Sequence, residues 1–297
     1  MDTSSALHAL GAQRLTGDQL RRFDADGFFV LDNVFAPEEC AEMGAEFDRL
    51  WEIDGDNAGM EVVLEGEDGE FHEPLEGRAT DIKTGSTRIS NIFNKSHVFD
   101  RCLCIGPLLA ASAHLLGDIK LHGANLREPH KGFGHQSLHS DVQKRFKGDW
   151  WLVNSLITFD NMTLDNGPTR IVPGSHHWPE LNVPDSNAMP SDVTDPDLLA
   201  FDRFPEDLFA PYPGEVLVTM PAGSIAVFNS SCWHGGTRKT NDARRRMLHL
   251  TYTRRCLKQQ LPQQHYLTQP LYDRLDDVQR WLFDLQVPAK SSPGYPI

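Results

Sequence analysis

Two short stretches of the sequence carry side chains that could hold a metal ion. In the first, a histidine stands two residues before an aspartate, as His139 and Asp141; in the second, His234 precedes two glycines. We expect the first stretch to lie in a strand over residues 136–142. Alternate side chains of a strand share a face, so His139 and Asp141 would stand side by side. With His234 from another strand they would form the two-histidine, one-carboxylate face that suits Fe(II) and leaves coordination positions open.

Each half of this pattern is weak by itself. A histidine near an aspartate is most often a surface pair, and a single histidine is more often hydrogen-bonded than a ligand. His135, four residues before His139, lacks the glutamate that a helical zinc motif requires, so we expect a structural or supporting role for it. Cys232 is expected to be a buried, inert thiol.

A dense cationic series follows His234 in an otherwise acidic chain. Most of its members are expected to form a solvated surface. Arg245, however, shares one strand face with Met247, His249 and Thr251, so it can reach into a barrel mouth. A guanidinium there binds a carboxylate through two parallel hydrogen bonds. A small dicarboxylate held at one end by Arg245 could chelate iron with its other end. The cationic residues are Arg238, Lys239, Arg244, Arg245, Arg246, Arg254 and Arg255.

Helix signals dominate the N-terminal part of the chain. Thr16 and Gln19 have capping-box spacing, and Gly27 ends that helix before a short buried strand at 28–31. A second helix is expected to begin at Pro37. Further helices are expected at 99–116 and at 271–285. The polar segments 54–81 and 184–213 are expected to be long loops and candidate lids.

From residue 119 the pattern changes to short strands separated by turn signals, which predicts a barrel or jelly roll. We found neither an internal repeat nor a long linker, so we expect one domain over residues 1–297. It would comprise a helical part at about 15–116, a mostly β core at about 119–255 and the C-terminal helix. The expected strands of the core cover 120–126, 136–142, 151–159, 169–172, 215–219, 224–228 and 245–253.

Composition limits the partners of the protein. The 297 residues are 39% hydrophobic and carry a net charge of −14. This charge disfavours broad contact with nucleic acid or an anionic membrane. The five cysteines form neither a disulfide framework nor a zinc motif. With no apparent export signal or membrane span, we expect a cytoplasmic protein that binds a small-molecule substrate, as a monomer or homodimer, without nucleic acid or membrane partners.

Several motifs occur in order between Leu15 and Tyr252. They are Gln-Ser-Leu-His-Ser-Asp at 136–141, Asn-Gly-Pro-Thr-Arg-Ile-Val-Pro-Gly-Ser-His at 166–176, Gly-Ser-Ile-Ala-Val-Phe at 223–228 and His-Gly-Gly at 234–236, with Arg245 downstream. Together these residues resemble the phytanoyl-CoA dioxygenase family of Fe(II)/2-oxoglutarate oxygenases. The resemblance implies a double-stranded β-helix (a cupin-like jelly roll) with flanking helices.

The resemblance also implies the ligands of the site. His139, Asp141 and His234 would hold Fe(II), and Arg245 would hold the distal carboxylate of 2-oxoglutarate. Gln136 and Thr169 match positions that often contact this co-substrate. Related halogenases replace the aspartate with a small residue, so its presence favours oxygenation. The expected reaction uses O2 and 2-oxoglutarate to hydroxylate an unactivated C–H bond of a small organic metabolite, with release of succinate and CO2.

Other outcomes remain open at this stage. The same site could catalyse desaturation, cyclisation or epimerisation of a natural product. A cupin-like metal oxygenase without 2-oxoglutarate is an alternative, although it would have no use for Arg245. A non-catalytic jelly-roll binding protein is a third possibility. Trp150, Trp151 and Trp233 could line the pocket, but core packing is favoured for at least two of them.

Overall fold

The computed structural model describes residues 2–54, 64–65, 71–72, 80–81, 86–183 and 193–286. Its N-terminal elements follow local sequence signals. Thr16 caps α2 (Gly17–Asp26) in a capping box with Gln19, and Gly27 ends the helix at a φ of 83°. Positive φ favours glycine because a side chain would be strained there. Helices α1 (Thr3–Ala9) and α3 (Pro37–Asp54) flank α2 and β1 (Phe28–Leu31) in sequence.

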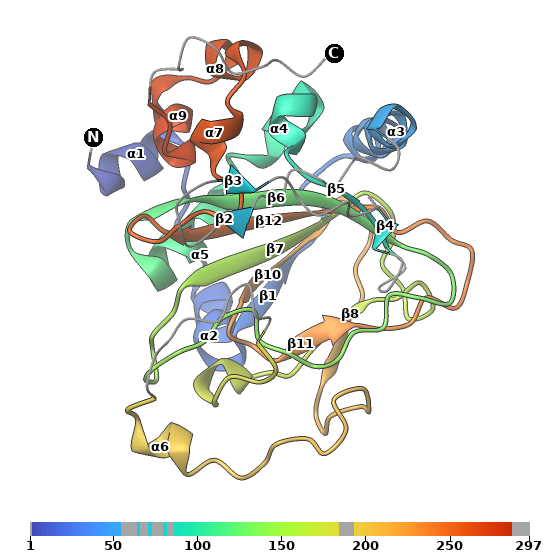
Figure 1. The fold of residues 1–297 in the computed structure, drawn as a ribbon, viewed down its shortest axis with the longest axis vertical. Coiled ribbons are helices and arrows are strands. Elements are labelled where there is room, and N and C mark those ends of the chain that lie inside the picture. Colours follow the sequence, from blue (N-terminus) through green and yellow to red (C-terminus); the bar gives the residue numbers. More distant parts are fainter. Residues whose placement is uncertain are drawn as a thin grey trace.

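Two β-sheets face each other in the structure (Figure 1). Among the described residues, the larger sheet has the antiparallel order β1-β10-β7-β12-β6-β5-β4, and the smaller one has the order β11-β8-β9. A separate ladder pairs β2 (Leu64–Glu65) with β3 (Phe71–His72). The other strands are β4 (Thr80–Asp81), β5 (Ser86–Ile89), β6 (Ile119–Pro129), β7 (Leu152–Thr158), β8 (Thr169–Ile171), β9 (Val216–Val218), β10 (Ile225–Asn229), β11 (His234–Gly236) and β12 (Met247–Arg254).

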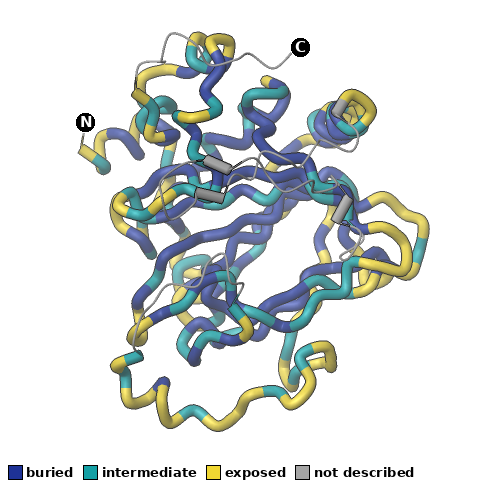
Figure 2. The backbone as a smooth tube through the Cα atoms, in the orientation of Figure 1, coloured by how far each residue is buried: buried dark blue, intermediate teal, exposed yellow. Residues whose placement is uncertain are grey.

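The two faces of the large sheet have different roles. Leu248, Leu250 and Tyr252 of β12 are buried in the main hydrophobic core beneath the covering helices. Met247 and His249 lie at alternate positions and belong to the opposite face, which turns toward the small sheet. Figure 2 shows buried backbone through both sheets, with exposed residues on the connecting loops and around α6 (Pro196–Leu199).

Two expected helices are broken. The segment 99–116 consists of a 3-10 helix, His97–Cys102, followed by α5 (Gly106–Leu116), which has a proline in its first turn. The C-terminal segment splits into α8 (Gln269–Arg274) and α9 (Asp277–Phe283), because Asp276 caps a new helix. The short helices α4 (Ile92–Lys95) and α7 (Gln263–Tyr266) complete the set of described α-helices.

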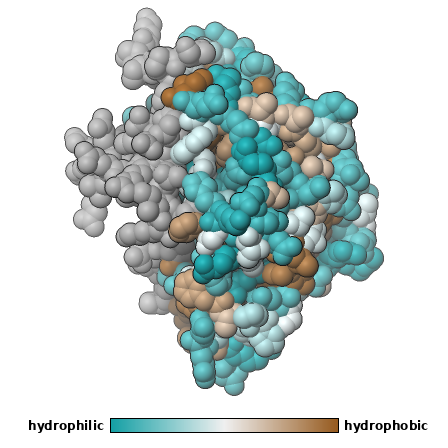
Figure 3. Space-filling model, turned by 90° about the vertical axis from the view of Figure 1, so that its right-hand side faces the viewer, coloured by the Kyte–Doolittle hydropathy of each residue, from teal (hydrophilic) through white to brown (hydrophobic). Residues whose placement is uncertain are grey.

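The two expected loops are only partly described. Most of 54–81 and residues 184–192 lie outside the described residues, and the remainder of the second segment includes α6. None of the helices in the described part of the chain has the length and apolarity to cross a membrane. The face in Figure 3 is mainly hydrophilic, with apolar groups scattered between polar ones.

Candidate metal centre

The segment that carries His139 and Asp141 is extended, but it is not the regular strand expected over 136–142. Within the described structure it forms an isolated antiparallel bridge between His139 and His234. The backbone N–H of each histidine donates to the carbonyl of the other, at 2.9 and 2.8 Å, and Asp141 N–H donates to Ser230 O at 3.0 Å. These bonds fix the two predicted ligand stretches against each other.

On its other edge this segment bonds to loops. Leu138 N–H donates to Leu208 O and Ser140 N–H donates to Leu181 O, at 2.8 and 2.7 Å. Arg170, almost fully buried, donates through its guanidinium to the carbonyls of Leu208 and Ala210 and so fixes the loop that receives Leu138. The segment that carries His139 and Asp141 therefore lies between β11 and a loop that Arg170 holds in place.

The three predicted ligands converge on one point. One potential ligand atom from each of His139, Asp141 and His234 lies within 4.8 Å of the others. Asp141 Oδ1 is 3.8 Å from His139 Nε2 and 3.6 Å from His234 Nε2. Atoms that ligate one ion at about 2 Å have separations of this order. Expectation and geometry thus agree on the same three side chains.

Both histidines are oriented as metal ligands require. Nδ1 of His139 is 2.8 Å from Ser137 O, and Nδ1 of His234 is 2.9 Å from Cys232 O. A backbone carbonyl only accepts, so each Nδ1 carries the proton and each Nε2 presents its lone pair toward the shared point. Burial, followed by the neighbouring His234, lowers the pKa of His139 to about 4 and keeps it neutral at physiological pH. The donor set fits Fe(II).

A small cavity of about 70 Å³ lies over these ligands, between the sheets. Gln136 and Thr169, both named from the sequence, are among its lining residues. Gln136 Oε1 also accepts from Gly236 N–H at 2.9 Å. A Cβ on Gly236 would collide with Gly134 O, so glycine is required where these two segments approach.

The sequence analysis placed His249 on the inner face of its strand but assigned no role to the wall opposite His139, Asp141 and His234. Arg127, Asn154 and His249 line the cavity from β6, β7 and β12. Burial, and then the charges of Arg127 and Arg245, lower the pKa of His249 well below its ordinary value. Asn154 accepts a hydrogen bond from the Thr251 hydroxyl at 3.0 Å. Polar residues at alternate strand positions are the signal that could have indicated this wall.

Arg245 is buried, with 6% of its surface exposed, just before β12 begins. It lies outside the set of described residues that line the cavity. Its Nε has no hydrogen-bond partner within the described structure. Burial and the charge of Arg127 lower its pKa to about 10, while Glu128 opposes the shift. Arg245 therefore remains charged at neutral pH, in a place where a carboxylate would satisfy it.

The other residues considered from the sequence pack against neighbouring side chains. Trp233 is fully buried in an apolar cluster, and Trp151 packs in another. Trp150 lies against the rings of His176 and His177. The described lining of the cavity includes none of these tryptophans. His135 packs edge-on against Phe209 at 5.2 Å between ring centroids. Burial raises the pKa of Cys232 to about 12, in agreement with an inert thiol.

Comparison with known proteins connects this geometry to a family. The model of the family Phytanoyl-CoA dioxygenase (PhyH) matches residues 23–247. Ectoine dioxygenase from Bordetella bronchiseptica is 26% identical over 249 residues, which cover 75% of this chain and 70% of that protein.

Solved structures with a similar fold include HygX from Streptomyces hygroscopicus with nickel, 2-oxoglutarate and hygromycin B bound. It has a TM-score of 0.56 and 18% identity, with 82% of this chain and 90% of that chain covered. The epimerase SnoN, in complex with Fe3+, alpha ketoglutarate and nogalamycin RO, has a TM-score of 0.53 and 17% identity, with 84% of each chain covered. At these identities the two structures establish the jelly-roll fold.

Proposed function

The chain belongs to the phytanoyl-CoA dioxygenase family, and from this premise we propose that His139, Asp141 and His234 hold the iron of an Fe(II)/2-oxoglutarate-dependent dioxygenase. We further propose that Arg245 binds the distal carboxylate of 2-oxoglutarate and that residues 1–297 act as one catalytic domain. The product that we propose is a hydroxylated small organic metabolite. The enzyme class and the need for iron, 2-oxoglutarate and O2 follow from the family; the residue roles are our proposal.

The convergence of two imidazoles and one carboxylate carries this proposal. Their potential ligand atoms lie within 4.8 Å of one another, although they come from stretches far apart in the sequence. Both Nδ1 atoms are held by carbonyls, so Nε2 of each imidazole faces the common point without reorganisation. An accidental surface cluster would lack this matched orientation.

When bound, iron and 2-oxoglutarate supply the O2-dependent oxidation of a C–H bond, with loss of CO2 and formation of succinate. The protein contributes positioning and exclusion of water. His139, Asp141 and His234 would hold the metal through two imidazoles and one carboxylate, a donor set that leaves room for the co-substrate. Arg245 would hold the distal carboxylate of the co-substrate through its guanidinium and so orient it toward the iron ligands.

We propose that the substrate binds in the cavity over His139, Asp141 and His234. The cavity of about 70 Å³ is well below the roughly 300–1,000 Å³ of typical small-ligand pockets. We therefore expect lining side chains to move when co-substrate and substrate bind. Arg127, Asn154 and His249 offer polar contacts on the wall opposite the metal ligands. They are the first positions at which to seek altered substrate preference.

Anaerobic titration tests the site directly. Fe(II) and 2-oxoglutarate together should give the weak visible metal-to-ligand charge-transfer absorption of the chelate. Asp141→Asn should weaken Fe(II) binding on the order of tenfold or more, because it removes the anionic ligand. A screen of candidate metabolites for succinate formation, followed by mass analysis of the products, would distinguish hydroxylation from desaturation, cyclisation or epimerisation.

The matched control is Asp149→Asn, which changes a buried aspartate that pairs with Arg145 away from the described cavity lining. This variant should retain Fe(II) binding even if it melts at a lower temperature. If the native protein develops no absorption band, or if Asp141→Asn binds Fe(II) as tightly as the native protein, the assignment of the metal ligands is wrong.

A further inference from the structure

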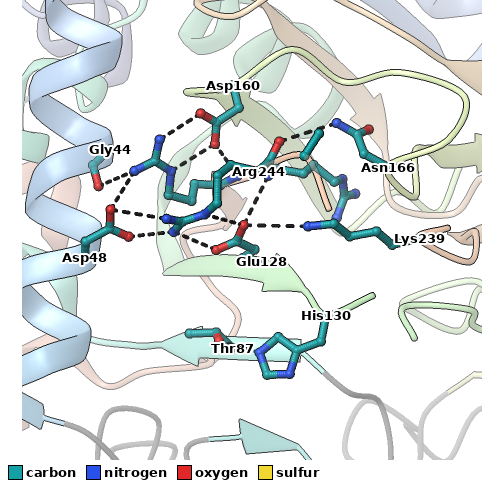
Figure 4. A network of polar contacts seen from close by, with 12 residues as sticks. Gly44, Asp48, Thr87, Glu128, His130, Asp160, Asn166, Lys239 and Arg244 are labelled. Carbon is teal, nitrogen blue, oxygen red and sulfur yellow. Dashed lines mark hydrogen bonds and ion pairs between the residues drawn. The ribbon is translucent and has the colours of Figure 1, made fainter. Parts of the chain in front are cut away.

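Glu128, near the end of β6, is the centre of a polar network that includes Arg244 and Lys239 (Figure 4). Its carboxylate accepts from Arg244 Nε and Nη2, each at 2.8 Å, and lies 3.8 Å from Lys239 Nζ. Oε1 also accepts from the backbone N–H of Arg245 at 3.2 Å. Glu128 is 8% exposed, so these contacts form largely away from water.

The three consecutive arginines have different surroundings. Arg244 donates to Asp48 Oδ1 of α3 at 2.6 Å, and Arg246 donates to Asp48 Oδ2 at 2.8 Å. Arg246 also donates to Asp160 through its backbone N–H, Nε and Nη2, at 2.8–2.9 Å. Arg245 lies between these two arginines in the sequence and is buried. Successive side chains of an extended chain point to opposite faces, so Arg245 faces away from Arg244 and Arg246. Both neighbours of the co-substrate arginine are thus fixed by carboxylates.

We propose that Glu128 is a positioning residue for 2-oxoglutarate binding: by accepting the Arg245 N–H while holding Arg244, it fixes the backbone from which the Arg245 guanidinium reaches the co-substrate. This inference rests on the proposed role of Arg245. Since Nε of Arg245 has no hydrogen-bond partner in the described structure, the direction of its side chain depends on its backbone and on packing.

Positioning by Glu128 and the charge of Glu128 predict opposite changes in the affinity for 2-oxoglutarate. Glu128 lies close enough to Arg245 for its charge to oppose the lowered pKa of that arginine. Removing a negative charge near an anion site would, by Coulomb's law alone, strengthen the binding of 2-oxoglutarate. Loss of positioning would weaken it. A measured change in affinity therefore separates the two effects by its direction.

Two substitutions of Glu128 separate the effect of side-chain length from the effect of its charge. Glu128→Asp keeps the charge but withdraws the carboxylate by one methylene, whereas Glu128→Gln keeps an acceptor at the same reach and removes the charge. We expect Glu128→Asp to raise the Kd of 2-oxoglutarate on the order of tenfold, a usual effect of losing a partner that orients a binding residue. Glu128→Gln should retain most of the affinity. Neither should alter Fe(II) binding, and kcat at saturating 2-oxoglutarate should persist.

Asp160→Ala is the matched control, because Asp160 binds Arg246 as Glu128 binds Arg244 and Arg245. It should lower the melting temperature but leave the Kd of 2-oxoglutarate nearly unchanged. Anaerobic titration of the charge-transfer absorption measures each Kd without turnover. Unchanged or tighter binding in Glu128→Asp, or an equal loss in Asp160→Ala, would overturn the inference. If Arg245→Met also leaves the affinity unchanged, the proposed function of Arg245 fails as well.

Discussion

Replacing Arg245 with methionine should weaken 2-oxoglutarate binding and yet leave the unliganded protein at least as stable. Methionine fills similar space without the charge. In the unliganded protein, burial and Arg127 lower the pKa of Arg245 from 12.5 to about 10. At about 1.4 kcal/mol for each pH unit, this drop corresponds to about 3 kcal/mol by which the folded state disfavours the charged side chain at neutral pH.

We expect bound 2-oxoglutarate to reverse this balance. A guanidinium that holds a carboxylate in a buried site contributes hydrogen bonds of about 1.5–3 kcal/mol each. Losing about 3 kcal/mol would raise the Kd of 2-oxoglutarate roughly 100-fold. The unliganded Arg245→Met protein should melt at or above the native temperature, by up to about 5 °C. The stabilisation that 2-oxoglutarate gives the iron-loaded native protein should largely disappear.

Anaerobic thermal melts with and without 2-oxoglutarate, together with titration of the charge-transfer absorption, measure both quantities. Arg274→Met is the control, because Arg274 pairs with Asp100 at 2.7 Å and is not among the described residues that line the cavity. This control should melt lower and bind 2-oxoglutarate normally. A large loss of stability in unliganded Arg245→Met, or an unchanged Kd, would refute the reasoning.

Two further predictions concern close packing and pH. Gly236→Ala should destabilise the fold by about 1–3 kcal/mol and weaken Fe(II) binding, because its Cβ collides with Gly134 O beside His234. Thermal melting and Fe(II) titration measure both effects. The control Gly17→Ala should show neither, because Gly17 is exposed and its Cβ would make only an ordinary contact with the Arg21 side chain at 3.4 Å. His176 is buried and its pKa falls from 6.5 to about 3, chiefly through desolvation. The unfolded chain therefore binds a proton below pH 6.5 that the folded chain refuses, so stability falls as pH drops from 6.5 toward 3. Between pH 6.5 and 5 this group should remove about 2 kcal/mol, a loss that His176→Gln should lack in urea unfolding; equal pH slopes for both proteins would contradict the prediction.

Local chemistry made much of the fold predictable from the sequence. The Thr16 capping box and Gly27 determine α2 at both ends, and Pro37 correctly predicted the start of α3. The same reasoning failed at α8 and α9. There the apolar periodicity runs on, but Asp276 accepts from two backbone N–H groups and begins a new helix. The N-cap at Asp276 therefore determined the helix boundary, although the apolar spacing continues across it.

The proposed metal ligands illustrate a different limit of sequence analysis. Strand alternation correctly predicted that His139 and Asp141 stand together, yet residues 136–142 do not form a regular strand. One edge of the segment bonds to His234 and Ser230, whereas Leu138 bonds to the carbonyl of Leu208. Partners in distant loops leave no periodic pattern in the sequence. The period-2 argument held because the backbone is extended, whatever its partners are.

Arg127 was missed for a reason that also explains where the site lies. Strand β6 was expected to end at residue 126, but it continues to Pro129, so Arg127 lies on the inner face opposite Met247. Along β12 this face changes from Met247, packed in an apolar cluster, to His249 in the cavity wall. Burying cationic side chains such as Arg127 costs free energy unless an anionic group pairs with them. The proposed metal ligands His139, Asp141 and His234 line the same cavity, so the proposed site lies at the polar end of the space between the sheets.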